Sequence, residues 1–171
     1  MENDIVNKAI KHLSAYFFVD TEVWSRRGKS RIDMVLVHLS DISNKYPIGV
    51  EFKINEKKQG KDLGKWLKQA IRYTEADFVK YGKMLIITYP QISGLYMEEG
   101  IRMAKHPFEN SGIYGYHHNV NTFLAQFNVG ELQYYIRDDK YYYRIVFNAV
   151  QVWDEYYNSF QTERILLWQN I

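Results

Sequence analysis

The chain has 171 residues, 46% of them hydrophobic and 25% charged, a balance that predicts one globular domain and excludes a disordered tail. The net charge of +2 neither demands nor excludes a nucleic-acid partner, and the absence of cysteine excludes disulfides and thiolate metal sites. No apolar run approaches the roughly 18 residues that span a bilayer, and acidic residues occupy the N-terminus where a signal peptide carries bases. We therefore expect no membrane partner and a location in the cytoplasm, whether bacterial, archaeal or of a viral host.

The first half of the chain predicts helices and strands in alternation. Apolar residues with the spacing of one helical face indicate a helix over residues 3–17, with Asn3 as its cap. Three β-branched, apolar stretches separated by polar turns predict strands at residues 18–24, 32–39 and 48–54. A short turn at residues 41–44 makes the second and third of these strands an antiparallel pair.

A second helix and a fourth strand follow. Apolar positions from Leu63 to Thr74 share one helical face. Residues 83–89 predict a buried strand that ends at Pro90, and residues 94–105 predict another helix.

The last third of the chain changes to a period of two, which is typical of strands. The expected strands lie at residues 113–116, 123–127, 132–137 and 141–147. Asp138-Asp139 is the expected hairpin turn, and residues 163–169 predict a short helix. The whole order predicts a single α/β domain over residues 1–171, with a mixed sheet in a core over about 1–118 and a β-rich extension over about 119–171.

Two carboxylates and a lysine lie in the paired second and third strands. In a hairpin centred on residues 42–43, Asp33 lies opposite a position between Glu51 and Lys53, and all three side chains share a face if it opposes either one. Two carboxylates this close repel unless a cation compensates, and Mg²⁺ or Mn²⁺ is the natural choice because hard ions take oxygen ligands. Such an ion lowers the pKa of a water molecule and polarises a phosphoryl oxygen, with Lys53 placed to stabilise the extra charge. For Glu-x-Lys alone, a cross-strand ion pair on a solvated face is the better explanation.

A polar pair on the second helix adds to this set. Gln69 and Tyr73 are four residues apart and therefore neighbours on one helical face. They border the apolar stripe, where an amide and a phenol could hold a phosphate, a strand end or the lysine. Taken singly, the tyrosine is better explained by packing and the glutamine by surface exposure.

The combination resembles the PD-(D/E)XK nuclease superfamily, in particular the branch with a glutamine–tyrosine helix motif. This branch includes RecB-like and Cas4-like nucleases, lambda-type exonucleases and the nuclease domain of type I restriction subunits. The matching segments are residues 31–36, 49–53 and 69–73, within a motif-bearing region of roughly residues 2–90. The resemblance implies a restriction-endonuclease-like core, with a central mixed sheet flanked by helices. It also implies a Mg²⁺- or Mn²⁺-dependent deoxyribonuclease that cuts phosphodiester bonds with a metal-activated water, as in DNA repair or recombination.

The resemblance also implies roles for individual residues. The implied metal ligands are Asp33, Glu51 and the backbone carbonyl of Phe52. Lys53 would be the catalytic lysine, and Gln69 and Tyr73 would assist contact with DNA.

Some positions depart from the family pattern or match it weakly. Members often add a glutamate from the first helix, for which Glu2 is the best candidate and Glu22 the fallback, although an acid at a helix N-terminus also stabilises the helix dipole. Ile32 stands where many members have proline before the aspartate. The iron–sulfur site of many Cas4-like proteins is excluded, since there is no cysteine.

Two basic segments flank the expected site and would steer DNA towards it, because each neutralised phosphate releases counterions. The first segment contains Arg26, Arg27, Lys29 and Arg31, and the second contains Lys57, Lys58 and Lys61. Arg31, two residues before Asp33, is the best candidate for a phosphate contact. For the second segment, a solvated turn is an equal alternative.

Other patterns in the C-terminal half favour structural roles. His117 and His118 are adjacent, so in a strand they point to opposite faces and cannot easily share an ion. The tyrosines at 134–135 and 141–143 are better explained by cross-strand packing than by base stacking. For the β-rich tail, the sequence fits two roles equally well: a homodimer interface or a substrate-binding extension.

There are two alternatives to a catalytically active nuclease. One is a catalytically inactive nuclease-fold module that binds DNA or a protein partner, and the other is an unrelated α/β domain in which the motif is coincidental. Endonuclease or exonuclease action, the preferred DNA and the pathway do not follow from the sequence.

Overall fold

The computed structural model describes residues 2–52, 59–89 and 121–165 of the chain. Its elements are α1 (Glu2–Leu13), β1 (Phe17–Trp24), β2 (Arg31–His38), β3 (Ile48–Phe52), α2 (Gln59–Glu75), β4 (Leu85–Tyr89), β5 (Val129–Arg137), β6 (Lys140–Phe147), β7 (Val150–Asp154), β8 (Ser159–Phe160) and η1 (Thr162–Arg164). The expected helix at 94–105 and strand at 113–116 lie outside the described residues.

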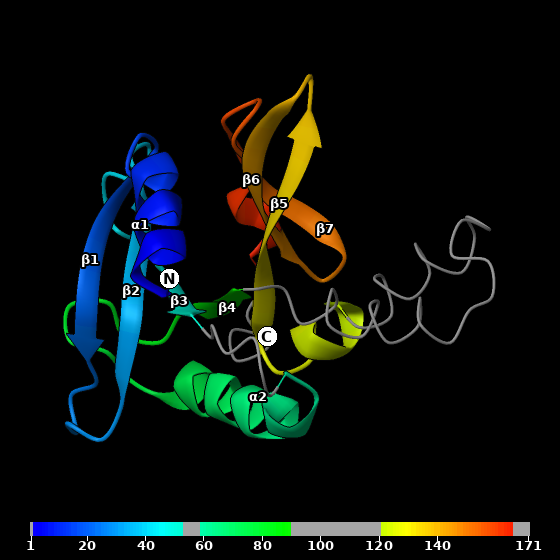
Figure 1. The fold of residues 1–171 in the computed structure, drawn as a ribbon. Helices are drawn as coiled ribbons and strands as arrows, with labels where there is room; N and C mark the ends of the chain where they lie inside the picture. The colour runs from blue at the N-terminus through cyan, green and yellow to red at the C-terminus, as the bar shows by residue number, and fades with distance from the viewer. Residues whose placement is uncertain (1, 53–58, 90–120, 166–171) are drawn as a thin grey trace.

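The strands form one eight-stranded mixed sheet in the order β1-β2-β3-β4-β5-β6-β7-β8. β1, β2 and β3 are an antiparallel meander, β3, β4 and β5 are parallel, and β5 to β8 are antiparallel again. The antiparallel pairing predicted for the second and third strands is therefore confirmed, as is the α/β class with mixed strand directions. The strands predicted in the extension continue the same sheet, because β5 pairs directly with β4 (Figure 1).

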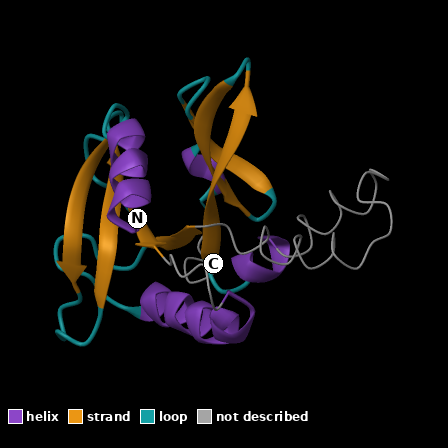
Figure 2. Cartoon of the chain, in the orientation of Figure 1, coloured by secondary structure: helices purple, strands orange, loops and turns teal. Residues whose placement is uncertain are grey.

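The two long helices pack on opposite faces of this sheet (Figure 2). Side chains alternate between faces along each strand, and in β2 Leu36 belongs to the cluster under α1 whereas Val35 belongs to the cluster under α2. Both helices bury an apolar stripe, represented by Leu13 in α1 and Ala70 in α2, each fully buried. The sheet thus has a core on both sides, which makes its central strands almost wholly buried.

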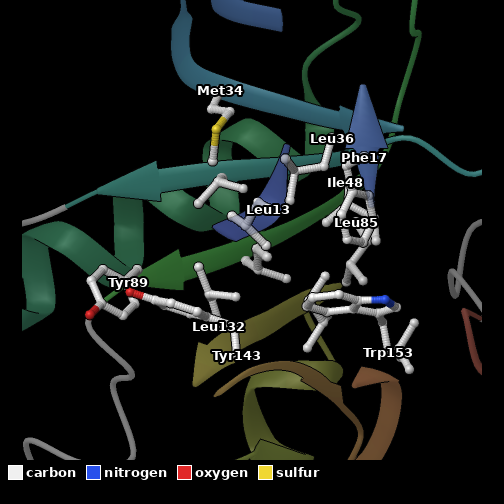
Figure 3. Packing of buried hydrophobic residues seen from close by; sticks show 14 of the residues in the cluster. Leu13, Phe17, Met34, Leu36, Ile48, Leu85, Tyr89, Leu132, Tyr143 and Trp153 are labelled. Carbon is white, nitrogen blue, oxygen red and sulfur yellow. The ribbon is translucent and has the colours of Figure 1, made fainter. Parts of the chain in front are cut away.

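The sheet curves so that strands from both of its ends contact α1. The α1 cluster joins Leu13 to Phe17 of β1 and to Trp153 of β7, whose ring lies 4.9 Å from that of Phe17 (Figure 3). His12 adds a polar contact, because its Nδ1 lies 2.8 Å from Oε1 of Glu155. Residues more than 130 positions apart are therefore held together around one helix.

One expected boundary and one expected element are wrong. The first helix ends at Leu13 instead of residue 17, because Phe17 is buried as the first residue of β1. Residues 121–125 are helical, where a strand over 123–127 was expected. In this short helix Leu124 is buried against the α2 cluster, and the exposed ring of Phe123 packs edge-on against that of Phe127 in the following turn, with 5.5 Å between the ring centroids. A short apolar run fits either helix or strand by its periodicity alone.

The hairpin between β5 and β6 matches its sequence signal. Asp138 and Asp139 have φ angles of 49° and 57° and join β5 to β6, as predicted. The tyrosine rings pack across these strands, with the Tyr135 and Tyr142 rings 5.8 Å apart. Of the final helix predicted at 163–169, the structure describes a single 3-10 turn, Thr162–Arg164, and residues 166–171 lie outside the described part.

Candidate functional site

Asp33 and Glu51 lie where β2 and β3 stop pairing. The ladder between these strands runs as far as the pair Met34 and Val50, and the two carboxylate residues are the next opposed positions. Beyond that point Asp33 Oδ2 accepts a hydrogen bond of 2.8 Å from the backbone N–H of Phe52. The Asp33 side chain therefore takes over where the backbone ladder ends, and it fixes the first of the two carboxylates against β3.

Gln69 of α2 holds the second carboxylate. Its Nε2 donates to Glu51 Oε1 at 2.8 Å and to the hydroxyl oxygen of Tyr73 at 2.7 Å. The i to i+4 spacing on α2 places the amide and the phenol side by side, as the sequence predicts. We call this set the Glu51–Gln69–Tyr73 chain.

Both ends of this chain are buried. Glu51 is only 2% exposed, and the Tyr73 ring packs edge-on against Phe78 with 6.2 Å between the ring centroids. A buried carboxylate is costly unless hydrogen bonds or a cation stabilise its charge. The Gln69 amide therefore supplies part of that stabilisation and fixes the orientation of the Glu51 carboxylate.

The donor atoms at this place are oxygens, the kind that Mg²⁺ prefers. Asp33 and Glu51 are hard oxygen donors from adjacent strands, and the carbonyl of Phe52 follows Glu51 directly. Within the described residues, no three histidine, aspartate or glutamate side chains gather as a metal-binding group. Mg²⁺ is commonly bound by one or two carboxylates and several waters.

The other residues predicted for the metal site are Glu2, its fallback Glu22, and the catalytic lysine Lys53. The Glu22 carboxylate lies 3.4 Å from Arg31 and is largely exposed, with φ of 53° at its backbone. Glu2 is the first residue of α1, and its side chain lies outside the described part. Lys53 also lies outside the described residues, so its role stays a prediction.

A further buried carboxylate lies in the same row of the sheet. Glu51 is paired with Thr88 of β4, which is paired in turn with Glu131 of β5. Glu131 is fully buried and its Oε2 accepts from Asn121 Nδ2 at 3.1 Å and from Gln133 Nε2 at 3.3 Å. Sequence reasoning missed Glu131, because it lies just before the strand expected from residue 132. Glu131 lies near the start of β5, and its place in this row depends on the parallel pairing of β3, β4 and β5, which the sequence alone does not show.

A basic pocket of about 810 Å³ opens beside the Glu51–Gln69–Tyr73 chain. It lies between the β1–β2 turn and α2, and its lining is Trp24, Lys29, Ser30, Arg31, Lys65, Lys68, Gln69, Arg72 and Tyr73. Five of these nine residues are cationic and none is acidic. Because Gln69 and Tyr73 form part of the wall, the pocket borders the residues that hold Glu51.

The cations of the basic pocket come from two sources, and the sequence predicted only one of them as a nucleic-acid contact. Lys29 and Arg31 were expected from the basic turn. Lys65, Lys68 and Arg72 were missed, although their spacing along α2 brings them to one side of the helix. A basic stripe along one helix is a known sign of nucleic-acid binding.

The other residues predicted to contact DNA either do not line the basic pocket or lie outside the described residues. Arg26 Nε lies 3.2 Å from Asp77 Oδ1, and neither Arg26 nor Arg27 lines the pocket. Lys57 and Lys58 lie outside the described residues, as do His117 and His118, and of Lys61 only its place in α2 is described. Of the four basic residues predicted in this turn, Lys29 and Arg31 line the basic pocket, and contact with DNA stays a prediction for all four.

Comparisons with protein-family models, with curated proteins and with solved structures found no match. No helix in the described ranges is long and apolar enough to cross a bilayer.

The arrangement supplies two chemical capabilities in one region. The carboxylates of Asp33 and Glu51 can bind a divalent cation, and the pocket cations can bind phosphates. Gln69 joins the two parts, since it touches Glu51 and lines the pocket.

Proposed function

We propose that this protein is a Mg²⁺- or Mn²⁺-dependent DNA nuclease that hydrolyses phosphodiester bonds, built on a restriction-endonuclease-like core. The observation that carries the proposal is the position of Gln69. Its amide holds the buried carboxylate of Glu51, and the same side chain lines a pocket with five cations. A phosphodiester bound in that pocket lies next to the oxygen ligands of a divalent ion.

Each residue of the site has a role in this proposal. Asp33, Glu51 and the Phe52 carbonyl hold the ion, which when bound lowers the pKa of a water molecule and polarises the phosphoryl oxygen. Gln69 keeps the Glu51 carboxylate in its binding orientation, as partners of metal ligands generally do. Lys53, the residue after Phe52, stabilises the negative charge that develops on the phosphate.

The order of elements supports the same proposal. The segment α1-β1-β2-β3-α2-β4 gives a meander followed by a helical crossover into a parallel strand, with helices on both faces. This is the mixed sheet flanked by helices that the motif resemblance implies.

The direct test is cleavage of linear, circular, single-stranded and branched DNA in Mg²⁺, in Mn²⁺ and in chelator. We expect metal-dependent cutting that falls below detection in Asp33→Asn and Glu51→Gln, because each loses an ionised metal ligand. Asp139→Asn is the matched control: it makes the same change in an exposed hairpin turn and should cut at the wild-type rate. The proposal is wrong if no substrate is cut with either ion, or if both site variants cut normally.

The basic pocket also supports a second candidate, a module that binds DNA without cutting it. Lys68→Gln with Arg72→Gln tests the pocket itself, and Lys140→Gln in the β5–β6 hairpin is its control. For every phosphate that a variant no longer binds, the slope of log affinity against log salt should fall by about 0.7 to 0.9. Salt-dependent binding that needs these cations, without cleavage under any condition, would favour the second candidate.

A further inference from the structure

Trp24 is the one aromatic residue of the basic pocket whose ring faces solvent to a large extent. It is 52% exposed, although tryptophan is usually well buried. Tyr73, the other aromatic residue of the lining, is 7% exposed and packs in the α2 cluster. A large apolar ring is thus displayed in a pocket that otherwise consists of cations and polar groups.

The ring is held in place by its cross-strand neighbour. Trp24 of β1 is paired with Arg31 of β2, and the guanidinium carbon lies 5.7 Å from the ring centroid. Glu22 in turn lies 3.4 Å from Arg31. The cation supports the indole, which lines the pocket and remains 52% exposed.

We propose that the basic pocket takes a single-stranded segment of DNA, with an unpaired base stacked on Trp24 and the neighbouring phosphates bound by the α2 cations. This inference deepens the proposed function and rests on it for the identity of the ligand as nucleic acid. A ligand that binds through phosphates alone would contact the lysines and arginines but would make no favourable contact with the exposed indole of Trp24. Both faces of a base in a duplex are covered by adjacent base pairs, so only an unpaired base can stack on the ring.

The dimensions agree with such a ligand. A volume of about 810 Å³ is within the range of pockets that enclose a small organic ligand. An unpaired nucleotide of a single strand has the size of such a ligand, whereas a duplex offers the pocket only its backbone phosphates and covered bases.

The first test needs no variant. Anisotropy titrations in chelator compare a labelled strand of twenty thymidines with an abasic strand of equal length and charge, and with a hairpin duplex. We expect the thymidine strand to bind about tenfold more tightly than the abasic strand, because base–aromatic stacking contributes on the order of 1–3 kcal/mol per base. Equal binding of the thymidine and abasic strands overturns the inference.

The second test assigns the preference to Trp24. Trp24→Ala should lose the tenfold preference for the thymidine strand, keep its affinity for the abasic strand and duplex within about twofold, and be partly restored by Trp24→Phe. Phe18→Ala is the matched control, since Phe18 lies on the same strand, is 58% exposed and is not part of the pocket lining. If Trp24→Ala weakens all three ligands equally, Trp24 is not a stacking residue.

The outcomes separate this inference from the proposed function. Binding is measured in chelator, so a preference that requires Trp24 stands even if no cleavage occurs. Conversely, metal-dependent cleavage whose ratio of single-stranded to duplex cutting is the same in Trp24→Ala as in the wild type supports the nuclease and overturns the stacking role.

Discussion

At the scale of single residues, Gln69 connects the carboxylates to the basic pocket. One amide nitrogen donates to Glu51 and to Tyr73, and the side chain also lines the basic pocket. Removal of this amide would leave a carboxylate that is 2% exposed without one of its donors. Loss of a hydrogen-bond partner to a buried charged group is among the costlier single changes in a protein.

We predict that Gln69→Ala lowers the single-turnover cleavage rate by about 10–100-fold, the usual effect of losing a residue that orients a metal ligand. The half-saturating Mn²⁺ concentration should rise with it, since a freely rotating Glu51 binds the ion less well. A structural defect alone would not move the metal dependence. The control is Gln126→Ala, at an exposed position after the helical residues 121–125. An unchanged Mn²⁺ dependence would contradict the orienting role.

Tyr81 gives a second prediction, on alkaline stability. Burial, and then the hydrogen bond of 3.0 Å that its hydroxyl donates to Asp20, raise the pKa of Tyr81 to about 12 from 10.0. Between pH 10 and 12 the folded state therefore keeps a proton that the unfolded state has lost, so the free energy of unfolding falls as pH rises through this range.

Tyr81→Phe should make this alkaline loss shallower, as measured by urea denaturation midpoints at about pH 9, 10 and 11. It should not abolish the loss, because burial also raises the pKa of Tyr89 and of Tyr135. Tyr141→Phe, at an exposed position of β6, is the control for the tyrosine change. A pH dependence identical to the wild type would contradict the role of Tyr81.

At the scale of elements, the hairpin between β6 and β7 contains a correctable strain. Asn148 and Ala149 form its two-residue turn with φ angles of 52° and 59°. Asn tolerates the left-handed region, whereas the Cβ of alanine makes it unfavourable. Ala149 is thus a weak point in an otherwise well-formed turn.

We predict that Ala149→Gly raises the free energy of unfolding by about 0.5–1 kcal/mol, because glycine removes the steric cost of the positive φ. Ala70→Gly in α2 makes the same substitution with the opposite expected sign, a loss of about 1 kcal/mol or more. Thermal unfolding followed by circular dichroism measures both. A destabilised Ala149→Gly would show that the alanine methyl contributes more through packing than it costs.

The elements also show what the sequence could predict. The antiparallel pairing of β2 and β3 was predictable because the two strands follow each other in the chain with only nine residues, 39–47, between them, fewer than a parallel crossover needs. Asp33 and Glu51 could therefore be brought together from the sequence. The i to i+4 rule did the same for Gln69 and Tyr73.

Contacts between distant segments were not predictable in this way. The row from Glu51 to Glu131 depends on two parallel pairings, and no local pattern fixes their register. The pocket depends on how α2 packs beside the β1–β2 turn, so the basic stripe of Lys65, Lys68 and Arg72 could be read from their spacing but its place beside Lys29 and Arg31 could not. The helix at residues 121–125 was mistaken for a strand because five residues are too few to separate the two periods.

At the scale of the whole molecule, both halves of the chain are joined by the single sheet and by the packing of strands from both of its ends against α1. The α1 cluster includes residues from Ala9 to Ile165, and the β4–β5 pair joins the expected core to the expected extension. Removal of either half would expose the apolar face that the other half covers.

We therefore predict a single cooperative unfolding transition. Native-state hydrogen exchange should give the same free energy of opening for Val50 in β3 and Ile145 in β6, both fully buried in that cluster. A markedly lower value for Ile145 would show that the extension is a separate folding unit.

The tight turns of the β5–β6–β7 meander bear on the order in which the chain folds. Two-residue loops close at little entropic cost and hairpins form within microseconds, so this meander can assemble by itself early. The β3–β4 and β4–β5 pairs must wait for their long crossover connections, and such non-local pairing is slow. Glu51 meets Gln69 only after the first of these crossovers has closed, so a half-assembled chain would lack the oriented carboxylate.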